Sequence, residues 1–221
     1  MSFTSSTKQR LVGTLVLTTF LGILSAFTYT VRTEHHLVDN SLIKSKNAVN
    51  YKIDQQKSKI TWLAKKVSGE HSGEIKIASG NLNFDGQHLI GGDFILDTRS
   101  ISVTDVKDKE TNGKLVGHLK NDDFFAVEKF PEARFVITNV KKKSDGLYDV
   151  QGNLTIKGIT KPISFSATTK VVDQQIVANA KIRVNRTDYG IKFRSTNFFE
   201  NLGDKAIYDD FDLQVNLVAN R

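Results

Sequence analysis

Two histidines and two pairs of aspartates are the residues whose types could support acid–base chemistry. His71 lies between two glycines in Gly69–Gly73, and His118 precedes Leu119 and Lys120, so either imidazole could meet a polar group at the edge of an apolar site. General acid–base catalysis needs carboxylates in contrasting environments beside a substrate. The adjacent pairs Asp122–Asp123 and Asp209–Asp210 are more typical of solvated turns and strands. A hydrogen-bonded structural role is the simpler interpretation of both histidines.

Other reactive or metal-binding patterns are absent from the sequence. The chain has no cysteine, which excludes disulfides, thiol catalysis and thiolate metal sites. His35 and His36 are adjacent, so their side chains project differently, and no third ligand stands near them in the sequence. Neither a GxSxG motif nor a phosphate-binding glycine-rich loop occurs. We therefore predict a protein that is not an enzyme and has no metal site and no cofactor.

Large apolar side chains are the residues that we expect to contact a ligand, because an aromatic and aliphatic lining selects an apolar guest. Packing of an ordinary core would choose the same residue types. We also include one histidine, His118, which could meet a polar headgroup of the ligand. The predicted ligand-binding residues are Trp62, Phe84, Phe94, Leu96, His118, Phe124, Phe125, Phe135, Ile156, Phe165 and Ile182.

Charge is spread thinly along the chain. The 221 residues carry a formal net charge of +7, of which five basic and two acidic residues before position 50 supply +3. The remaining 26 basic and 22 acidic residues are interleaved and supply only +4. A surplus this small is typical of a solvated surface, not of a phosphate-binding stripe, so we predict no nucleic-acid partner.

The N-terminal segment has the pattern of a targeting sequence. Residues Leu11–Val31 carry no charge, follow Lys8 and Arg10, and are about long enough to cross a bilayer as a helix. Ser25 and Ala26 suit a signal peptidase, whereas Leu24 interrupts a clean cleavage pattern, so residues 1–31 are either a signal peptide or a membrane anchor. We expect a hydrophobic helix here, a polar linker over 32–50, and export of residues 51–221 to the periplasm or the outward face, with anchoring to the inner membrane by residues 11–31 as one outcome.

After Tyr51 the dominant hydrophobic period is two, which predicts half-buried β-strands. The alternation is clearest over residues 148–156, 163–171, 176–184 and 211–217, with turn signals at Ser144–Gly146, Lys157–Gly158 and Asp173–Gln174. The apolar register slips by one residue near Ser79 and Gly80, which predicts a bulge or sharp bend.

About eight such strands occur, and no amphipathic helix is long enough to cover a sheet. The segment 105–131 lacks the alternation and reads as a long excursion, with a short helix near residues 114–119. A sheet without a covering layer must cover itself, as a closed barrel or a sandwich, and closure also removes exposed edges. The predicted fold is all-β: an eight-stranded antiparallel barrel.

Five segments make the sequence similar to the YceI-like family of lipid- or polyisoprenoid-binding proteins. They are DFILDTRSI (93–101), HLKNDDFF (118–125), KFP (129–131), LTIKGITK (154–161) and RTDYGI (186–191), in matching order and spacing within residues 51–219. The resemblance implies a lipocalin-like barrel with a polyprenyl chain inside, commonly exported to the bacterial periplasm. Ala126 and Asn185 depart from the acidic residues usual in the family, and the N-terminal anchor is not general to it.

We therefore expect a barrel that binds and shields or carries a polyisoprenoid or quinone-like lipid, with the membrane as a partner through the N-terminal segment and a homodimer as a compatible assembly. Two alternatives stay open at this point. One is an enzyme acting on a small apolar substrate with His71 or His118 as base. The other is a filled barrel that acts as an interaction module through its outer face.

Overall fold

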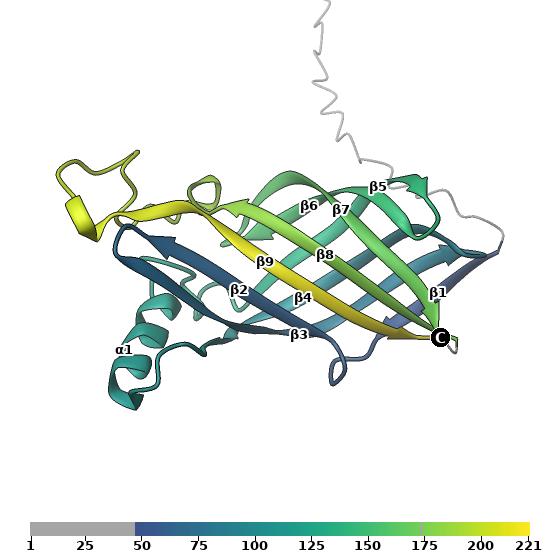
Figure 1. The fold of residues 1–221 in the computed structure, drawn as a ribbon, viewed down its shortest axis with the longest axis horizontal. Coiled ribbons are helices and arrows are strands. Elements are labelled where there is room, and N and C mark those ends of the chain that lie inside the picture. Colours follow the sequence, from purple (N-terminus) through teal and green to yellow (C-terminus); the bar gives the residue numbers. More distant parts are fainter. Residues whose placement is uncertain (1–46, 173) are drawn as a thin grey trace, which may run out of the picture. The chain divides into compact units, whose positions relative to one another are not determined.

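Nine antiparallel strands and one α-helix make up the part of the chain that the computed structural model describes, residues 47–172 and 174–221. Figure 1 shows the strands wrapping around one interior, with the helix at one end. The strands are β1 (Ala48–Ile53), β2 (Lys59–Lys66), β3 (Gly69–Asp85), β4 (His88–Val103), β5 (Glu132–Ser144), β6 (Leu147–Ile156), β7 (Ile159–Val172), β8 (Gln175–Asn185) and β9 (Ile207–Asn220); the helix α1 is Lys109–Lys120.

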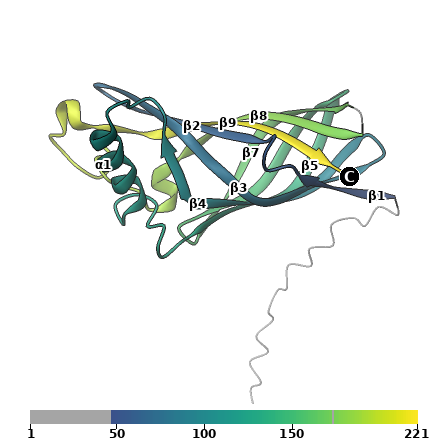
Figure 2. The same ribbon diagram turned by 90° about the horizontal axis from the view of Figure 1, so that it is seen from below.

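The sheet closes into an eight-stranded barrel, as predicted, because β1 and β2 share one position in it. Lys52 of β1 pairs with Asn81 of β3 and Asn220 of β9, and Ile60 of β2 pairs farther along the same two strands. The two short strands thus form one interrupted strand between β3 and β9, and pairing of β3 with β4 completes the ring. Figure 2 shows the same ring from a second side. A closed ring leaves no unpaired sheet edge.

The N-terminal boundary of the barrel differs slightly from the predicted one. β1 begins at Ala48, so the strand includes the last three residues of the predicted linker over 32–50. The predicted hydrophobic helix and the anchoring by residues 11–31 lie outside the described residues. Within the described ranges no helix is long and apolar enough to cross a membrane.

The period-two pattern identifies the inward face correctly. Along β6 the side chains of Tyr148, Val150, Leu154 and Ile156 are buried, and their neighbours on the strand face outward. The β3–β4 register shifts between Ile77 and Ser79, which confirms the bulge predicted from the slipped hydrophobic pattern.

The excursion between β4 and β5 contains the predicted helix, which is longer than its apolar pattern indicates. Asp108 accepts a hydrogen bond from the backbone N–H of Thr111 at 2.8 Å, so the helix begins at Lys109 and not near Lys114. No residue of α1 is fully buried. Because the first turn of α1 is polar, a prediction based on hydrophobic residues misses the start of the helix.

Arg186 fixes the connection between β8 and β9 at the helix end of the barrel. Its guanidinium is buried and donates to the carbonyl oxygens of Tyr208 (3.0 Å), Ile191 (2.8 Å), Phe193 (3.0 Å) and Ile207 (2.9 Å) and to Asp209 Oδ1 (3.2 Å). Burial lowers the pKa of Arg186, and the neighbouring Asp209 acts against that change. Arginine has five N–H donors, and all five are used here, so the residue joins both ends of the connection.

We expect Arg186→Met to lower the free energy of unfolding by about 3–5 kcal/mol, because it leaves a buried carboxylate and four carbonyl groups without their shared donor. Arg183→Met is the matched control: Arg183 lies on β8 in an exposed ion pair with Asp212, and its loss should cost less than about 1 kcal/mol. Urea denaturation followed by circular dichroism measures both values. Equal effects of the two substitutions would contradict the structural role of Arg186.

Candidate ligand-binding cavity

The interior of the barrel is hollow, and its middle section forms a narrow cavity of about 100 Å³. Thr169 is the one lining residue with a polar side chain among those described. We call this space the central cavity. It is lined by side chains of β2–β9, including Phe94, Leu96, Phe135, Ile163, Phe165, Ala178, Ala180, Ile182, Leu213 and Val215.

Small inward-facing residues on adjacent strands explain why the space stays open. Ala180 of β8 pairs with Ala167 of β7 on one side and with Val215 of β9 on the other. Gly152 of β6, the strand next to β7, leaves room for the ring of Phe135, since a Cβ there would lie about 2.5 Å from the Val136 carbonyl oxygen and closer still to that ring. The alanines on β7 and β8 therefore leave space beside the larger side chains that point inward.

A second cavity continues the hollow toward the helix end, and we call it the mouth cavity. Its volume is about 100 Å³. Leu96, Leu154 and Leu213 line both cavities, so the two are adjacent. Its remaining lining is mostly apolar but includes Thr98, Arg186, Tyr208 and Asp210. Tyr208, at the start of β9, lines this cavity and is 56% exposed.

Nine of the eleven predicted ligand-binding residues line this hollow. Phe94, Phe135, Phe165 and Ile182 face the central cavity, Leu96 faces both, and Trp62, Phe124, Phe125 and Ile156 face the mouth cavity. Whether a ligand contacts them stays a prediction. The structure adds residues that sequence reasoning did not select, among them Ile60, Ala178, Ala180, Leu213 and Val215; these occupy the same period-two positions, which was the available signal.

Two of the predicted residues do not line either cavity. Phe84 is completely buried against Tyr51, with ring centroids 5.7 Å apart, and belongs to the packed core. His118 lies between the rings of Phe124 and Phe193, at 4.9 and 4.7 Å, so it supports a lining residue instead of facing the hollow. The alternation of apolar and polar residues shows which side chains face inward, but it does not show where along the barrel axis each one lies. Phe84 faces inward at a level where the interior is packed, so it does not line a cavity.

Both histidines considered as catalytic bases are hydrogen-bonded to carboxylates. His118 Nε2 lies 3.1 Å from Asp123 Oδ2, and His71 Nδ1 lies 2.9 Å from Asp105 Oδ2. Burial acts to raise the pKa of Asp105, but hydrogen bonds from the Ser72 backbone and from His71 outweigh it and lower the pKa. Neither imidazole lines the hollow, which agrees with the structural interpretation.

The acidic pairs have different environments. Asp122 accepts from the exposed Lys129 at 2.6 Å, as expected of a solvated carboxylate. Asp209 is instead largely buried and accepts from Arg186 and, at 2.6 Å, from Asn197, so the expectation that it is solvated is wrong. Its burial depends on Arg186, which stands 23 positions earlier. Within residues 47–172 and 174–221 no group of three or more potential ligands could hold a metal ion.

One lining side chain has an unused hydrogen-bond donor. Trp62 Nε1 and the Tyr189 hydroxyl are the buried side-chain polar atoms without a hydrogen-bond partner among the described residues. Burial raises the pKa of Tyr189 to about 12, so its hydroxyl stays protonated, but the residue lies outside the lining. Trp62 lines the mouth cavity. Its indole N–H is therefore a buried donor beside the mouth cavity that no described protein group uses.

Known proteins resemble both the sequence and the fold. The chain is 30% identical over 154 residues to the UPF0312 protein of Pseudomonas putida, an alignment covering 66% of this chain and 78% of that protein. A shorter stretch of 50 residues is 50% identical to Protein YceI of Salmonella arizonae, over 23% of this chain and 26% of that protein.

Two solved structures share the fold at low identity. BcnA of Burkholderia cenocepacia matches with a TM-score of 0.62 and 20% identity, covering 76% of this chain and 99% of that one. A polyisoprenoid binding domain from Saccharophagus degradans, implicated in plant cell wall breakdown, matches with a TM-score of 0.60 and 14% identity, covering 77% and 97%.

The model of the YceI-like domain matches residues 51–219, which includes almost the whole barrel and both cavities. The protein therefore belongs to the YceI-like family.

Proposed function

We propose that the barrel binds a slender apolar lipid, a polyisoprenoid or quinone-like molecule, and shields or carries it in the hollow interior. The observation that carries this proposal is a narrow hollow lined almost throughout by hydrocarbon side chains. Burial of each CH₂ group contributes about 0.8 kcal/mol, so a prenyl chain supplies ample driving force. The polyisoprenoid binding domain of Saccharophagus degradans, which shares the fold, supports the choice of lipid. From the charge pattern of the N-terminal segment, we place this activity in the periplasm or on an outward membrane face.

Catalysis has little support from the lining. The titratable residues that line the described hollow are Arg186, Tyr208 and Asp210, all in the mouth cavity. Every donor of Arg186 is already bonded within the protein. General acid–base work needs a group within hydrogen-bond reach of the reacting atoms, and neither His71 nor His118 lines the space. The two cavities in the interior favour the lipid-binding proposal over the filled-barrel alternative.

Organic extraction of the purified full chain, followed by mass spectrometry, tests the proposal directly. We expect a prenyl lipid at a stoichiometry near one per chain. An extract without lipid, together with no binding of added long-chain prenols or quinones, would overturn it.

Ala180→Phe should block the central cavity. The new ring extends into empty space, so we expect bound prenyl lipid to fall at least about tenfold while the melting temperature stays the same or rises. Lys181→Phe, the adjacent outward-facing position, should leave the bound lipid unchanged. Extraction and thermal melts measure both variants. Undiminished lipid in a folded Ala180→Phe variant would show that the guest is held elsewhere.

Trp62→Phe separates the two lipid classes. The substitution keeps an aromatic ring but removes the free N–H, and one neutral hydrogen bond is worth roughly 0.5–1.5 kcal/mol. We therefore expect affinity for a quinone to fall about two- to tenfold and affinity for an all-hydrocarbon prenyl chain to stay unchanged. Competitive displacement of a fluorescent lipid measures both. An equal loss for the two ligands would mean that Trp62 contributes packing only.

A further inference from the structure

Exposed apolar side chains gather at one end of the barrel. Among the described residues, seven large apolar side chains are exposed, and five of them lie at the mouth end. Isolated exposed apolar residues are normal on a protein surface, but a cluster marks an interaction site. The five, which we call the mouth rim, are Val67, Ile159, Phe198, Phe199 and Tyr208. Val171 and Val172 are at the other end, where β7 finishes.

Three separate segments form the mouth rim, and contacts hold them together. The backbone N–H of Val67, in the β2–β3 turn, donates to the Ala206 carbonyl at 3.1 Å. Asn197, which precedes Phe198, donates to Asp209, which follows Tyr208, at 2.6 Å. A Cβ on Gly190 would lie 3.5 Å from the side chain of Ile159, which places the β6–β7 turn against the same connection. Figures 1 and 2 both show the β8–β9 connection at the end that also carries α1, away from the C-terminus.

The two phenylalanines project from a hydrogen-bonded turn. Ser195 is fully buried, and its carbonyl accepts from the N–H groups of Phe198 (3.1 Å) and Phe199 (2.9 Å). The base of the connection is closed by Ile207 N–H donating to the Arg194 carbonyl at 2.9 Å, next to the contacts of Arg186. The aromatic rings, 47% and 49% exposed, are therefore presented to solvent by a fixed backbone.

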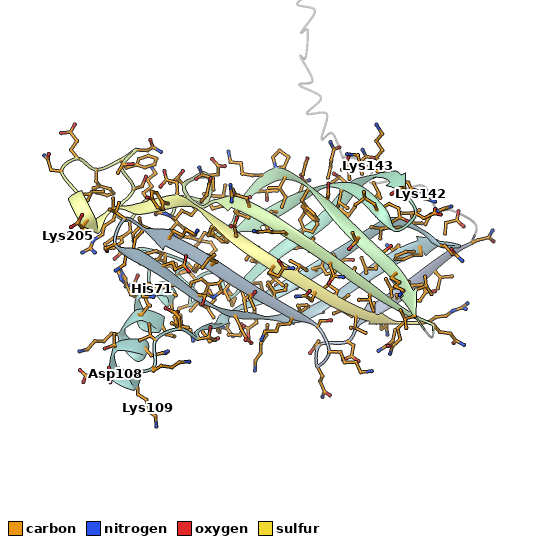
Figure 3. The ribbon with its side chains drawn as sticks, viewed as in Figure 1. His71, Asp108, Lys109, Lys142, Lys143 and Lys205 are labelled. Carbon is orange, nitrogen blue, oxygen red and sulfur yellow. The ribbon has the colours of Figure 1, made fainter. Side chains whose placement is uncertain are left out.

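Basic side chains accompany these rings. The Lys192 ammonium lies 4.6 Å from the centre of the Phe198 ring, and the Arg194 guanidinium lies 5.1 Å from that of Phe193. Lys205, labelled in Figure 3, lies on the same connection. The three basic residues Lys192, Arg194 and Lys205 outnumber the acidic residues Glu200 and Asp204 of the same connection by one. Apolar and aromatic tips with basic residues around them suit the interface of a bilayer that contains anionic lipids.

We propose that the mouth rim docks the barrel onto a phospholipid bilayer, so that the mouth cavity opens to the membrane when a lipid enters or leaves. The inference rests on the proposed function, since a guest of that class is nearly insoluble in water and resides in a bilayer. Tyr208 connects the two features, because it belongs to the mouth rim and also lines the mouth cavity.

The absence of cysteine allows one fluorescent label to be placed in the full chain. We expect Phe199→Cys carrying an environment-sensitive dye to brighten and shift to the blue on mixing with vesicles of phosphatidylethanolamine and phosphatidylglycerol. Lys143→Cys, at the opposite end in Figure 3, should not respond. The comparison isolates the mouth rim even if the N-terminal segment also binds the vesicles. No shift at position 199, equal shifts at both positions, or a shift that depends on protein concentration without vesicles would overturn the proposal, the last favouring a second copy as the partner.

The rate of lipid transfer from vesicles tests whether docking of the mouth rim lets a lipid enter the mouth cavity. Phe198→Ser with Phe199→Ser should slow uptake of a fluorescent prenyl lipid from vesicles at least about tenfold, with unchanged affinity for the same lipid delivered in detergent. Val171→Ser with Val172→Ser, a pair of similar exposure at the other end, should not alter the rate. Equal rates for the two double variants would overturn docking. If the unmodified protein fails to bind lipid from detergent while the label at position 199 still shifts, the proposed function fails and docking stands.

Discussion

Closure of the sheet around inward-facing side chains that leave part of the interior empty is the constraint on which this structure depends. An eight-stranded barrel encloses either a filled core or room for a small guest, and the difference lies in the sizes of its inward residues. Here Ala167, Ala178 and Ala180 stand on adjacent strands, and Gly152 lies on the wall beyond them. Water gains little in such a narrow hydrocarbon space, so the hollow favours an apolar chain.

The two ends of the barrel have different roles because different residues close them. At one end Phe84 packs on Tyr51 within a continuous core, and β1 occupies the same barrel position as β2. At the other end the β8–β9 connection, fixed by Arg186, surrounds an opening without filling it. A single buried guanidinium thus holds the cavity mouth and the exposed aromatic rings in one arrangement.

Polar groups near the hollow are nearly all bonded within the protein. The histidines pair with carboxylates, Asp209 pairs with Arg186 and Asn197, and Asn185 accepts from the Thr187 backbone at 2.8 Å at the start of the connection. Asparagine can accept this bond as well as the aspartate usual in the family, which accounts for that departure. Of the titratable residues in the lining, Arg186 is fully bonded within the protein, and Tyr208 and Asp210 lie in the mouth cavity.

The sequence by itself determined the strand pattern, the barrel, the bulge near Ser79 and nine of the lining residues, because alternation with period two records which side chains face inward. It could not determine how far along the axis each side chain lies, so Phe84 and His118 were assigned to the ligand although neither faces the hollow. Only the tertiary structure brought Arg186 to Asp209 and placed Phe198 and Val67 at one rim. Those contacts join segments far apart in the chain, and no local pattern encodes which turns a closed barrel brings to the same end.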